Sequence, residues 1–240
     1  MISLDASEQG ARAFWIWRSA SAVAVVTTRA WGNLAAHVGD DPEEVRNCRN
    51  VVARELLPAA QVATVRQVHG IEALTVPGNV HDWCELSDVG TADALIESQV
   101  QRPVAVFTAD CVPIVISSDT QVAVVHAGWR GMVDGVIEKT VASMTAFTHA
   151  KALVGPCIGP CCFEVGSEVA ERFPNHCTMS DASGVATAHV DLPHVASDRL
   201  NAVGCSVEHI NVCTRCDPRM HSFRRDGQES GRQAVIAWRT

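Results

Sequence analysis

The segment Gln121-Val-Ala-Val-Val-His-Ala-Gly-Trp-Arg-Gly131 combines the pattern of a buried strand with residues that can do chemistry. Its valine-rich run ends at His126, and Gly128 and Gly131 follow before a helical pattern begins. Glycine permits tight turns and a close approach of backbone, and open sheets usually place their ligands in the loops after strand ends. The segment therefore predicts a strand that delivers a histidine to its carboxyl end, although a lone histidine there is more often a packing residue.

Two other segments end in the same way. Gln61-Val-Ala-Thr-Val-Arg-Gln-Val-His-Gly70 closes on His69, and the apolar run from Pro103 to Ile116 is interrupted at Asp110 and Cys111. Two imidazoles and one thiol without an obvious fourth ligand are typical of a catalytic zinc site, which keeps one coordination position open. The same residues are equally compatible with a cysteine nucleophile and a histidine base. The spacing alone does not separate these two interpretations.

Five motifs, taken in order along the chain, resemble those of the laccase-domain family, the bacterial YfiH-type group also called multicopper polyphenol oxidase-like. The resemblance extends from about Val26 to Trp238, and the order of the motifs makes it specific. The motifs are Gln67-Val-His-Gly70, Thr108-Ala-Asp-Cys-Val-Pro-Ile114, Val125-His-Ala-Gly-Trp-Arg-Gly131, Gly155-Pro-Cys-Ile-Gly-Pro-Cys-Cys-Phe-Glu-Val165 and Phe223-Arg-Arg-Asp-Gly227.

The resemblance implies a function, a metal and a fold. Family members are described as zinc-dependent purine nucleoside phosphorylases that also have adenosine deaminase and methylthioadenosine phosphorylase activity. Their zinc ligands correspond to His69, Cys111 and His126, which would also form the catalytic centre. The resemblance therefore favours zinc, with copper as a less favoured metal, and a zinc-bound thiolate would be a ligand first. It also implies mixed β-sheets flanked by helices, akin to the catalytic domain of cytotoxic necrotizing factor toxins.

The chain departs from the family pattern in several places. The glycine-rich loop usually found after Thr27-Thr-Arg29 is shortened, and the usual Asn-Arg pair is Cys48-Arg49. The family's Cys-Thr-Tyr-Cys is Cys213-Thr-Arg-Cys216, and Phe223 replaces a common tyrosine. Because the chain contains no tyrosine, no phenol can act as its catalytic acid.

Composition sets broader limits. A chain of 240 residues with 47% hydrophobic residues suits one α+β domain over 1–240. Its net charge of −8 argues against nucleic-acid binding. The apolar runs are too short for a membrane helix, and the N-terminus lacks a signal-peptide pattern. We therefore expect a cytoplasmic protein, with the homodimer as one possible assembly, whose ten cysteines are reduced thiols.

The hydrophobic periodicity predicts a mixture of strands and helices. The first 20 residues show little pattern, and 174–186 are expected to form a surface excursion. Strands are expected over 22–28, 61–68, 73–76, 92–96, 103–108, 112–117, 121–126, 151–155, 207–213 and 233–238, and helices over 42–57, 132–147, 166–173 and 192–203.

Several polar residues are candidates for substrate binding. Arginine forks suit phosphate, and Arg224 belongs to a basic cluster with Arg215, Arg219 and Arg225, although surface arginines are often simply solvated. Asp110 is expected either to orient a ligand histidine or to cap a turn, and Glu164 either to act as an acid or base near the purine or to cap a helix. The candidates are Arg49, Arg130, Asn33, Asp110, Glu164 and Arg224.

The remaining cysteines suggest a second metal site less strongly. Cys213 and Cys216 have the spacing of half a zinc ribbon, but Cys157, Cys161 and Cys162 do not form a matching half. Buried free cysteine is common as a small hydrophobic residue. From the sequence alone, we therefore interpret these cysteines as small buried residues rather than as metal ligands.

The leading hypothesis is a zinc-dependent purine nucleoside phosphorylase acting on adenosine, inosine, guanosine and methylthioadenosine, with phosphate as co-substrate and with adenosine deaminase activity. Three alternatives remain. The first is a cysteine- or metal-dependent amidase acting on peptidoglycan precursors. The second is a copper-dependent polyphenol oxidase, which is disfavoured because the chain has no His-x-His cluster. The third is a non-enzymatic zinc-binding module.

Overall fold

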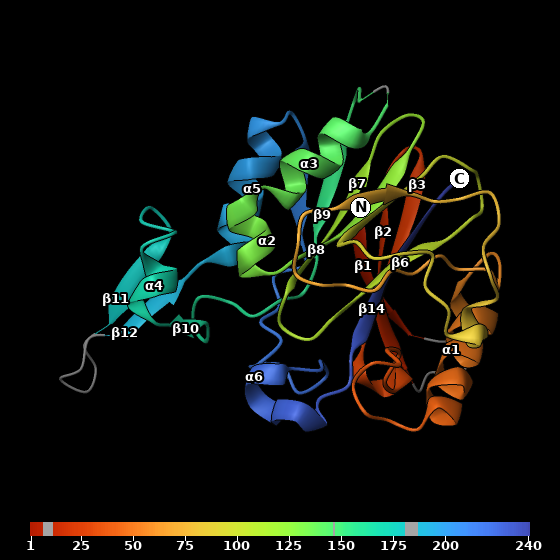
Figure 1. Ribbon diagram of the computed structural model, residues 1–240, viewed down its shortest axis with the longest axis horizontal. Coiled ribbons are helices and arrows are strands. Elements are labelled where there is room, and N and C mark those ends of the chain that lie inside the picture. Colours follow the sequence, from red (N-terminus) through yellow and green to blue (C-terminus); the bar gives the residue numbers. More distant parts are fainter. Residues whose placement is uncertain (7–11, 146, 181–186) are drawn as a thin grey trace.

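Two β-sheets packed face to face form the body of the protein, and helices cover the outer face of each (Figure 1). The computed structural model describes residues 1–6, 12–145, 147–180 and 187–240. The first sheet contains, in order, β13 (Ser206–His209), β9 (Lys151–Val154), β7 (Val112–Ser117), β8 (Val122–Ala127), β5 (Ala94–Glu97) and β4 (Ala73–Thr75). The second contains β1 (Ile2–Ala6), β2 (Ala13–Arg18), β3 (Ala22–Thr27), β14 (Gln233–Arg239) and β6 (Val104–Thr108).

Helices complete the layers. The outer face of the first sheet packs against α2 (Trp129–Asp134), α3 (Val136–Ser143) and α5 (Leu192–Ala202). The outer face of the second packs against α1 (Pro42–Leu56), which begins at an Asp41 cap and stops before Pro58, as expected. A small sheet of β10 (Glu164–Val165), β12 (Thr187–Val190) and β11 (Cys177–Ser180) lies to one side with α4 (Ser167–Ala170). Helix α6 (Phe223–Asp226) lies near the beginning of β14 (Figure 1). The expected α+β class, with mixed sheets flanked by helices, is confirmed.

The strand register brings polar residues to one edge of the first sheet. Both β5 and β7 run antiparallel to β8, with Ala94 opposite Val125 and Val112 opposite Ala127. The beginnings of β5 and β7 therefore flank the end of β8. Because side chains alternate along a strand, His126 projects on the same side as Val124, toward the space between the two sheets.

Several predicted elements differ from the structure. The expected helix over 132–147 is instead two helices, because Gly135 adopts φ 96° and interrupts the hydrogen-bond ladder, and α3 ends at Ser143. The segment 61–68 is not a regular strand and makes only isolated bridges. The N-terminal strands β1 and β2 were missed, although Ala13–Arg18 contains three aromatic residues that are buried in the structure. Part of the expected excursion forms β11, while its residues 181–186 lie outside the described part of the chain.

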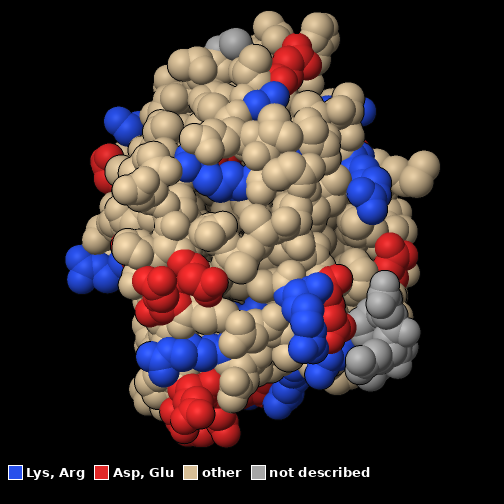
Figure 2. Space-filling view, turned by 90° about the vertical axis from the view of Figure 1, so that its right-hand side faces the viewer, with Lys and Arg blue, Asp and Glu red and all other residues tan. Residues whose placement is uncertain are grey.

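Charged side chains of both signs share the surface. On the face shown in Figure 2, lysine and arginine side chains lie between groups of aspartate and glutamate. Acidic and basic side chains are therefore not segregated from each other on this face.

Among the described residues, no helix is long and apolar enough to cross a membrane.

Candidate metal centre and active site

His69, Cys111 and His126 converge at the edge where β5, β7 and β8 meet. Their donor atoms lie within 4.8 Å of one another. The two imidazole rings are 4.7 Å apart between centroids and nearly perpendicular, at 82°. His126 is only 3% exposed, Cys111 is half-buried and His69 is exposed. Three donors from separate segments thus face one point, and the exposed side chain of His69 leaves this point accessible to solvent on one side.

Asp93, directly before β5, organises these residues. Its side chain is 0% exposed, and its Oδ1 lies 2.8 Å from Nδ1 of His126 while accepting the backbone N–H of His69 at 2.9 Å. Its Oδ2 accepts the backbone N–H of Gly70 at 2.6 Å. With Nδ1 engaged, His126 offers its Nε2 to a metal, as ligand histidines oriented by a carboxylate do. Sequence reasoning missed Asp93, although an aspartate between two alanines before a buried strand was a usable signal.

The electrostatics of the cluster couple its members. Burial opposes charge on Cys111, but the neighbouring imidazoles, chiefly that of His126, lower its pKa to about 6. Burial also opposes charge on His126, but Cys111 and Asp93 raise its pKa to about 9. Burial alone would raise the pKa of Asp93, yet the hydrogen bonds from His126 and Gly70 lower it. The cluster therefore favours a thiolate at Cys111, which suits either a metal ligand or a nucleophile.

One residue of the cluster, His69, and one residue next to it, Asp110, have unusual backbone conformations. His69 has φ 61° and Asp110 has φ 91°, in the region that non-glycine residues rarely adopt. Such conformations persist where surrounding contacts enforce them, and they concentrate at functional sites. The hydrogen bonds that Asp93 accepts from the backbone N–H groups of His69 and Gly70 help to hold His69 in this conformation.

The glycines after His126 allow the expected close approach. A Cβ on Gly128 would lie 2.9 Å from Cδ2 of His69 and 3.3 Å from Sγ of Cys111. A Cβ on Gly131 would lie 2.6 Å from the carbonyl oxygen of Gly70. The glycines therefore let α2 begin directly against the two segments that carry the other donors.

We predict that Gly128→Ala weakens metal binding more than it weakens folding. The added methyl group must displace the His69 ring from the position where the three donors converge. We expect zinc affinity to fall by about 10–100-fold, the range seen when groups that orient ligands are lost. Competition with a zinc-binding dye measures the affinity, and the melting temperature of metal-free protein serves as control. Wild-type zinc affinity in this variant would show that the ligand geometry has been misassigned.

A cavity of about 380 Å³ opens over the cluster, at the mouth of the space between the two sheets. The three donors form one part of its wall, and aromatic and cationic side chains form others. Besides His69, Cys111 and His126, it is lined by His37, Gln67, Phe107, Thr108, Ala109, Asp110, Ile158, Phe163, Phe223, Arg224 and Arg232. The size and the mixed polarity suit a small-molecule ligand.

Thr108 is one of the residues that line this cavity. Its side chain is 2% exposed, and its Oγ1 has no hydrogen-bond partner among the described residues. A buried hydroxyl without a partner costs free energy that a bound ligand could recover. Thr108 opens one of the sequence motifs, but nothing in the sequence distinguished its side chain from a packing residue.

Asp110 lines the cavity without orienting a ligand histidine. Its Oδ1 accepts a hydrogen bond from Oγ1 of Thr214 at 2.6 Å, and its Oδ2 accepts the backbone N–H of Arg224 at 2.6 Å. The carboxylate that is hydrogen-bonded to the ring of His126 is that of Asp93 instead. The alternative expectation, an aspartate that caps backbone, describes Asp110 better.

Two arginines reach the cavity wall. Nη1 of Arg224 donates to the carbonyl oxygens of Cys162 at 3.2 Å and Glu164 at 3.0 Å. Arg232, which sequence analysis missed because it belongs to no motif, is half-buried and donates from Nη1 to the carbonyl oxygen of Gly231 at 3.0 Å. Burial lowers the pKa of Arg232, and nearby Cys111 opposes that shift.

The other predicted binding residues do not line the cavity. Arg49 is 3% exposed, and its guanidinium donates to the carbonyl oxygens of Leu34 and Trp83, each at 2.8 Å. Arg130 is exposed, with its guanidinium 4.3 Å from the centroid of the Trp129 ring. The side chain of Asn33 accepts the backbone N–H of Arg232, and that of Glu164 is exposed. None of these four side chains is among the cavity-lining residues.

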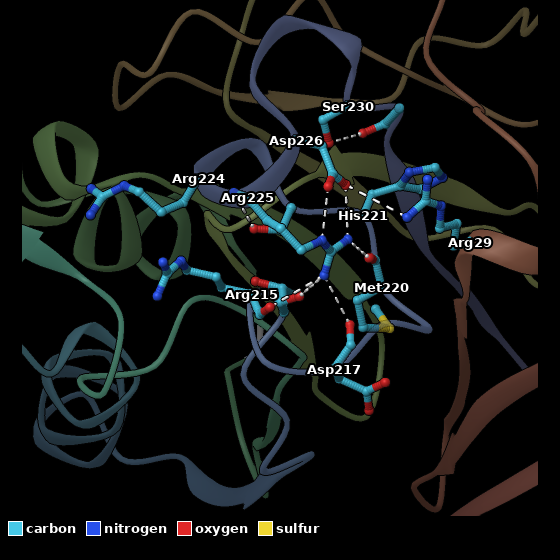
Figure 3. A network of polar contacts seen from close by, with 12 residues as sticks. Arg29, Arg215, Asp217, Met220, His221, Arg224, Arg225, Asp226 and Ser230 are labelled. Atoms are coloured by element: carbon cyan, nitrogen blue, oxygen red, sulfur yellow. Dashed lines mark hydrogen bonds and ion pairs between the residues drawn. The ribbon is translucent and has the colours of Figure 1, made fainter.

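The basic cluster divides into two parts in Figure 3. The guanidinium of Arg225 is surrounded by carbonyl oxygens, including that of Met220 at 2.6 Å, and pairs with Asp226 at 2.8 Å. Arg219 is paired with Asp217. Arg215 and Arg224 extend away from this network toward the same side. Arg225 therefore holds the loop together, whereas Arg224 reaches the cavity.

Comparisons with known proteins place this architecture in a family. A family model described as multi-copper polyphenol oxidoreductase laccase matches residues 23–240. The chain therefore belongs to this laccase-like family, and the resemblance found in its motifs is confirmed.

Individual relatives agree with the assignment. The purine nucleoside phosphorylase of Xylella fastidiosa strain 9a5c is 36% identical over 223 residues, covering 86% of this chain and 83% of that protein. Purine nucleoside phosphorylase YfiH of Escherichia coli K12 is 36% identical over 219 residues, covering 86% and 85%. The solved structure of YlmD from Geobacillus stearothermophilus has a TM-score of 0.81 at 27% identity, covering 98% of this chain and 99% of its own. Neisseria meningitidis protein NMB0706 has a TM-score of 0.79 at 30% identity, covering 94% and 98%.

Proposed function

We propose that this protein is a zinc-dependent purine nucleoside phosphorylase of broad specificity that also deaminates adenosine. The observation that carries the proposal is the convergence of His69, Cys111 and His126 on a cavity with arginines in its wall. Relatives named purine nucleoside phosphorylase supply the substrate class. The proposed substrates are adenosine, inosine, guanosine and methylthioadenosine, with inorganic phosphate.

The donor set fits zinc. Two imidazoles and one thiolate match the nitrogen and sulfur ligands that zinc prefers, and three protein ligands leave a coordination position for water or substrate. Asp93 would fix the ring of His126 by its hydrogen bond to Nδ1. When bound, zinc would supply a Lewis acid that activates water for attack at the purine ring.

The other cavity residues suit the remaining parts of a nucleoside and phosphate. The rings of Phe163 and Phe223 offer apolar faces to a purine. The unpartnered hydroxyl of Thr108 can bond a polar group of the substrate. Guanidinium groups bind phosphate oxygens well, so Arg224 and Arg232 replace Arg49 and Arg130 as the candidates for orienting phosphate against the ribose.

The phosphate requirement tests this function. Zinc-loaded protein is incubated with each purine nucleoside, with and without inorganic phosphate, and the products are separated by chromatography. We expect ribose 1-phosphate and free base only when phosphate is present, and inosine from adenosine in both cases. Free base released equally well without phosphate would make the protein a hydrolase.

We predict that Arg232→Gln weakens the use of phosphate by about 1.5–3 kcal/mol, the typical loss of a charged hydrogen-bond partner. The variant keeps a polar side chain at the cavity wall but removes the cation. Steady-state kinetics at varied phosphate measure the effect, and zinc content should stay unchanged. Arg130→Gln is the matched control, because that exposed arginine does not line the cavity. An equal loss in both variants would argue against a phosphate site at Arg232.

The alternatives have distinguishable outcomes. A zinc-containing protein that turns over no nucleoside would favour the amidase acting on peptidoglycan precursors, while oxidation of phenols after copper loading would favour the polyphenol oxidase. The open donor set and the cavity speak against a purely structural zinc module. We propose a cytoplasmic location, where the ten cysteines would stay reduced, with no nucleic-acid or membrane partner, and a homodimer as the assembly to test.

A further inference from the structure

A second cluster of donors lies outside the catalytic cavity. It consists of Cys161, Cys162, Cys213 and Cys216, whose sulfur atoms lie within 4.8 Å of one another. We propose that these four thiolates form a closed structural zinc site. Four cysteine ligands are the typical donor set of structural zinc, whereas a catalytic site keeps a position open.

The sulfur spacing agrees with tetrahedral coordination. Zinc–sulfur bonds of about 2.3 Å place the sulfurs of a tetrahedral site about 3.8 Å apart. Sγ of Cys216 lies 3.8 Å from Sγ of Cys161 and 3.3 Å from Sγ of Cys162. One sulfur therefore has two partners, which a single disulfide cannot satisfy.

Two backbone turns create the cluster. The N–H of Asp217 donates to the carbonyl oxygen of Cys213 at 2.9 Å, which closes the turn around Cys213-Thr-Arg-Cys216. The N–H of Cys162 donates to the carbonyl oxygen of Gly159 at 2.9 Å and closes the facing turn. A parallel bridge between Cys157 and Cys213 aligns the two segments. Cys157 therefore lies at the bridge between the two loops and is not part of the cluster. The neighbouring residues Cys161 and Cys162 supply the two ligands on this side, although their spacing in the sequence did not suggest a zinc site.

The surroundings suit a negatively charged thiolate cluster. The backbone N–H of Gly159 donates to Sγ of Cys213 at 3.3 Å, and Nη1 of Arg215 lies 3.5 Å from Sγ of Cys162. A Cβ on Gly159 would lie 3.3 Å from Cβ of Cys213, tighter than most contacts of this kind. Hydrogen-bond donors around a metal centre orient its ligands and offset their charge.

The site would fasten two loops of the cavity wall. The N–H of Ile158 donates to the carbonyl oxygen of Asp110, and Thr214 bonds the side chain of Asp110. The carbonyl oxygen of Cys162 accepts from Arg224. Both cysteine-bearing loops therefore contact the same wall, and zinc between them would fix the positions of Asp110 and Arg224.

Metal stoichiometry tests the proposal. Reduced, chelator-treated protein is reloaded with zinc, freed of excess metal and analysed for zinc per chain. We expect two zinc ions in wild type, one in the double variant Cys213→Ser/Cys216→Ser and one in Cys111→Ser. Cys84→Ser is the matched control and should keep two, because Cys84 lies in neither cluster. The double variant should also melt at a lower temperature than wild type when both are zinc-loaded.

Cobalt(II) and thiol protection give an answer even if the double variant does not fold. Cobalt-loaded Cys111→Ser should retain the intense absorption of a tetrahedral tetrathiolate centre. In wild type, zinc should protect all four cysteines from alkylation, as read by peptide mass spectrometry. Absence of zinc from Cys111→Ser, alkylation of the four thiols regardless of zinc, or a disulfide between Cys162 and Cys216 in freshly isolated protein would each overturn the proposal.

Discussion

Asp93→Ala should lower the free energy of unfolding by about 3–5 kcal/mol, the usual cost of removing one partner from a buried ionic pair. The substitution leaves the imidazole of His126 without its carboxylate and the backbone N–H groups of His69 and Gly70 without their acceptor. Denaturant unfolding of metal-free protein measures this loss directly. Zinc affinity should fall as well, because the rings that carry the donors lose their orientation.

Two controls separate this effect from general damage. Asp93→Asn keeps the volume and one carbonyl oxygen, so its stability should fall less than that of the alanine variant. Asp119→Ala removes an exposed carboxylate that bonds Thr148 and His149, and it should change stability little. An Asp93→Ala protein within about 1 kcal/mol of wild type would contradict the role assigned to this carboxylate.

Cys111→Ala should remove zinc from the catalytic centre while the fold persists. Zinc held by two histidines alone would be bound far more weakly, since the thiolate is the charged donor of the set. We expect phosphorolysis to fall by about a thousandfold, equivalent to about 4 kcal/mol of transition-state stabilisation. Product formation from inosine and zinc content are measured on the same samples.

The cysteine variants distinguish the two metal sites. If the four-cysteine cluster also holds zinc, the alanine variant should retain that ion and lose only the catalytic one. Cys84→Ser tests whether removal of any half-buried thiol has the same consequence. Full activity of wild-type protein freed of zinc, together with loss of activity in Cys111→Ala, would restore the interpretation of Cys111 as a nucleophile with a histidine base.

The convergence of Cys111 and His126 was predictable because each belongs to a local pattern, whereas the strand expected before His69 is not present. A valine-rich run that stops at His126 reports both the strand and its end, and the antiparallel pairing of β7 with β8 then brings Cys111 to the same edge. The close approach at the glycine-rich turn was also predictable, since the absence of a side chain at Gly128 lets the backbone lie directly against His69. Local sequence thus located the parts, although the choice between zinc and a nucleophile needed the family resemblance.

The features that the sequence did not predict depend on contacts between segments that are far apart in the chain. Asp93 lies 33 residues from His126 along the chain, and only strand pairing brings them together. Arg232 reaches the cavity because β14 lies between β3 and β6, an order that hydrophobic periodicity does not encode. The sequence did not favour the four-cysteine cluster for the same reason, because the pair Cys161 and Cys162 lies about 50 residues before the pair Cys213 and Cys216. Sequence patterns predict faces and ends of elements better than they predict which elements become neighbours.

The central claim is that the zinc held by His69, Cys111 and His126 is required for phosphorolysis of purine nucleosides. The most direct test is a titration of zinc into metal-free protein in the presence of inosine and phosphate, with ribose 1-phosphate as the measured product. We expect no product without metal, and product formation that rises with zinc and saturates when the catalytic centre is filled. Ribose 1-phosphate formed at the full rate by metal-free protein, or none at any zinc concentration, would contradict the claim.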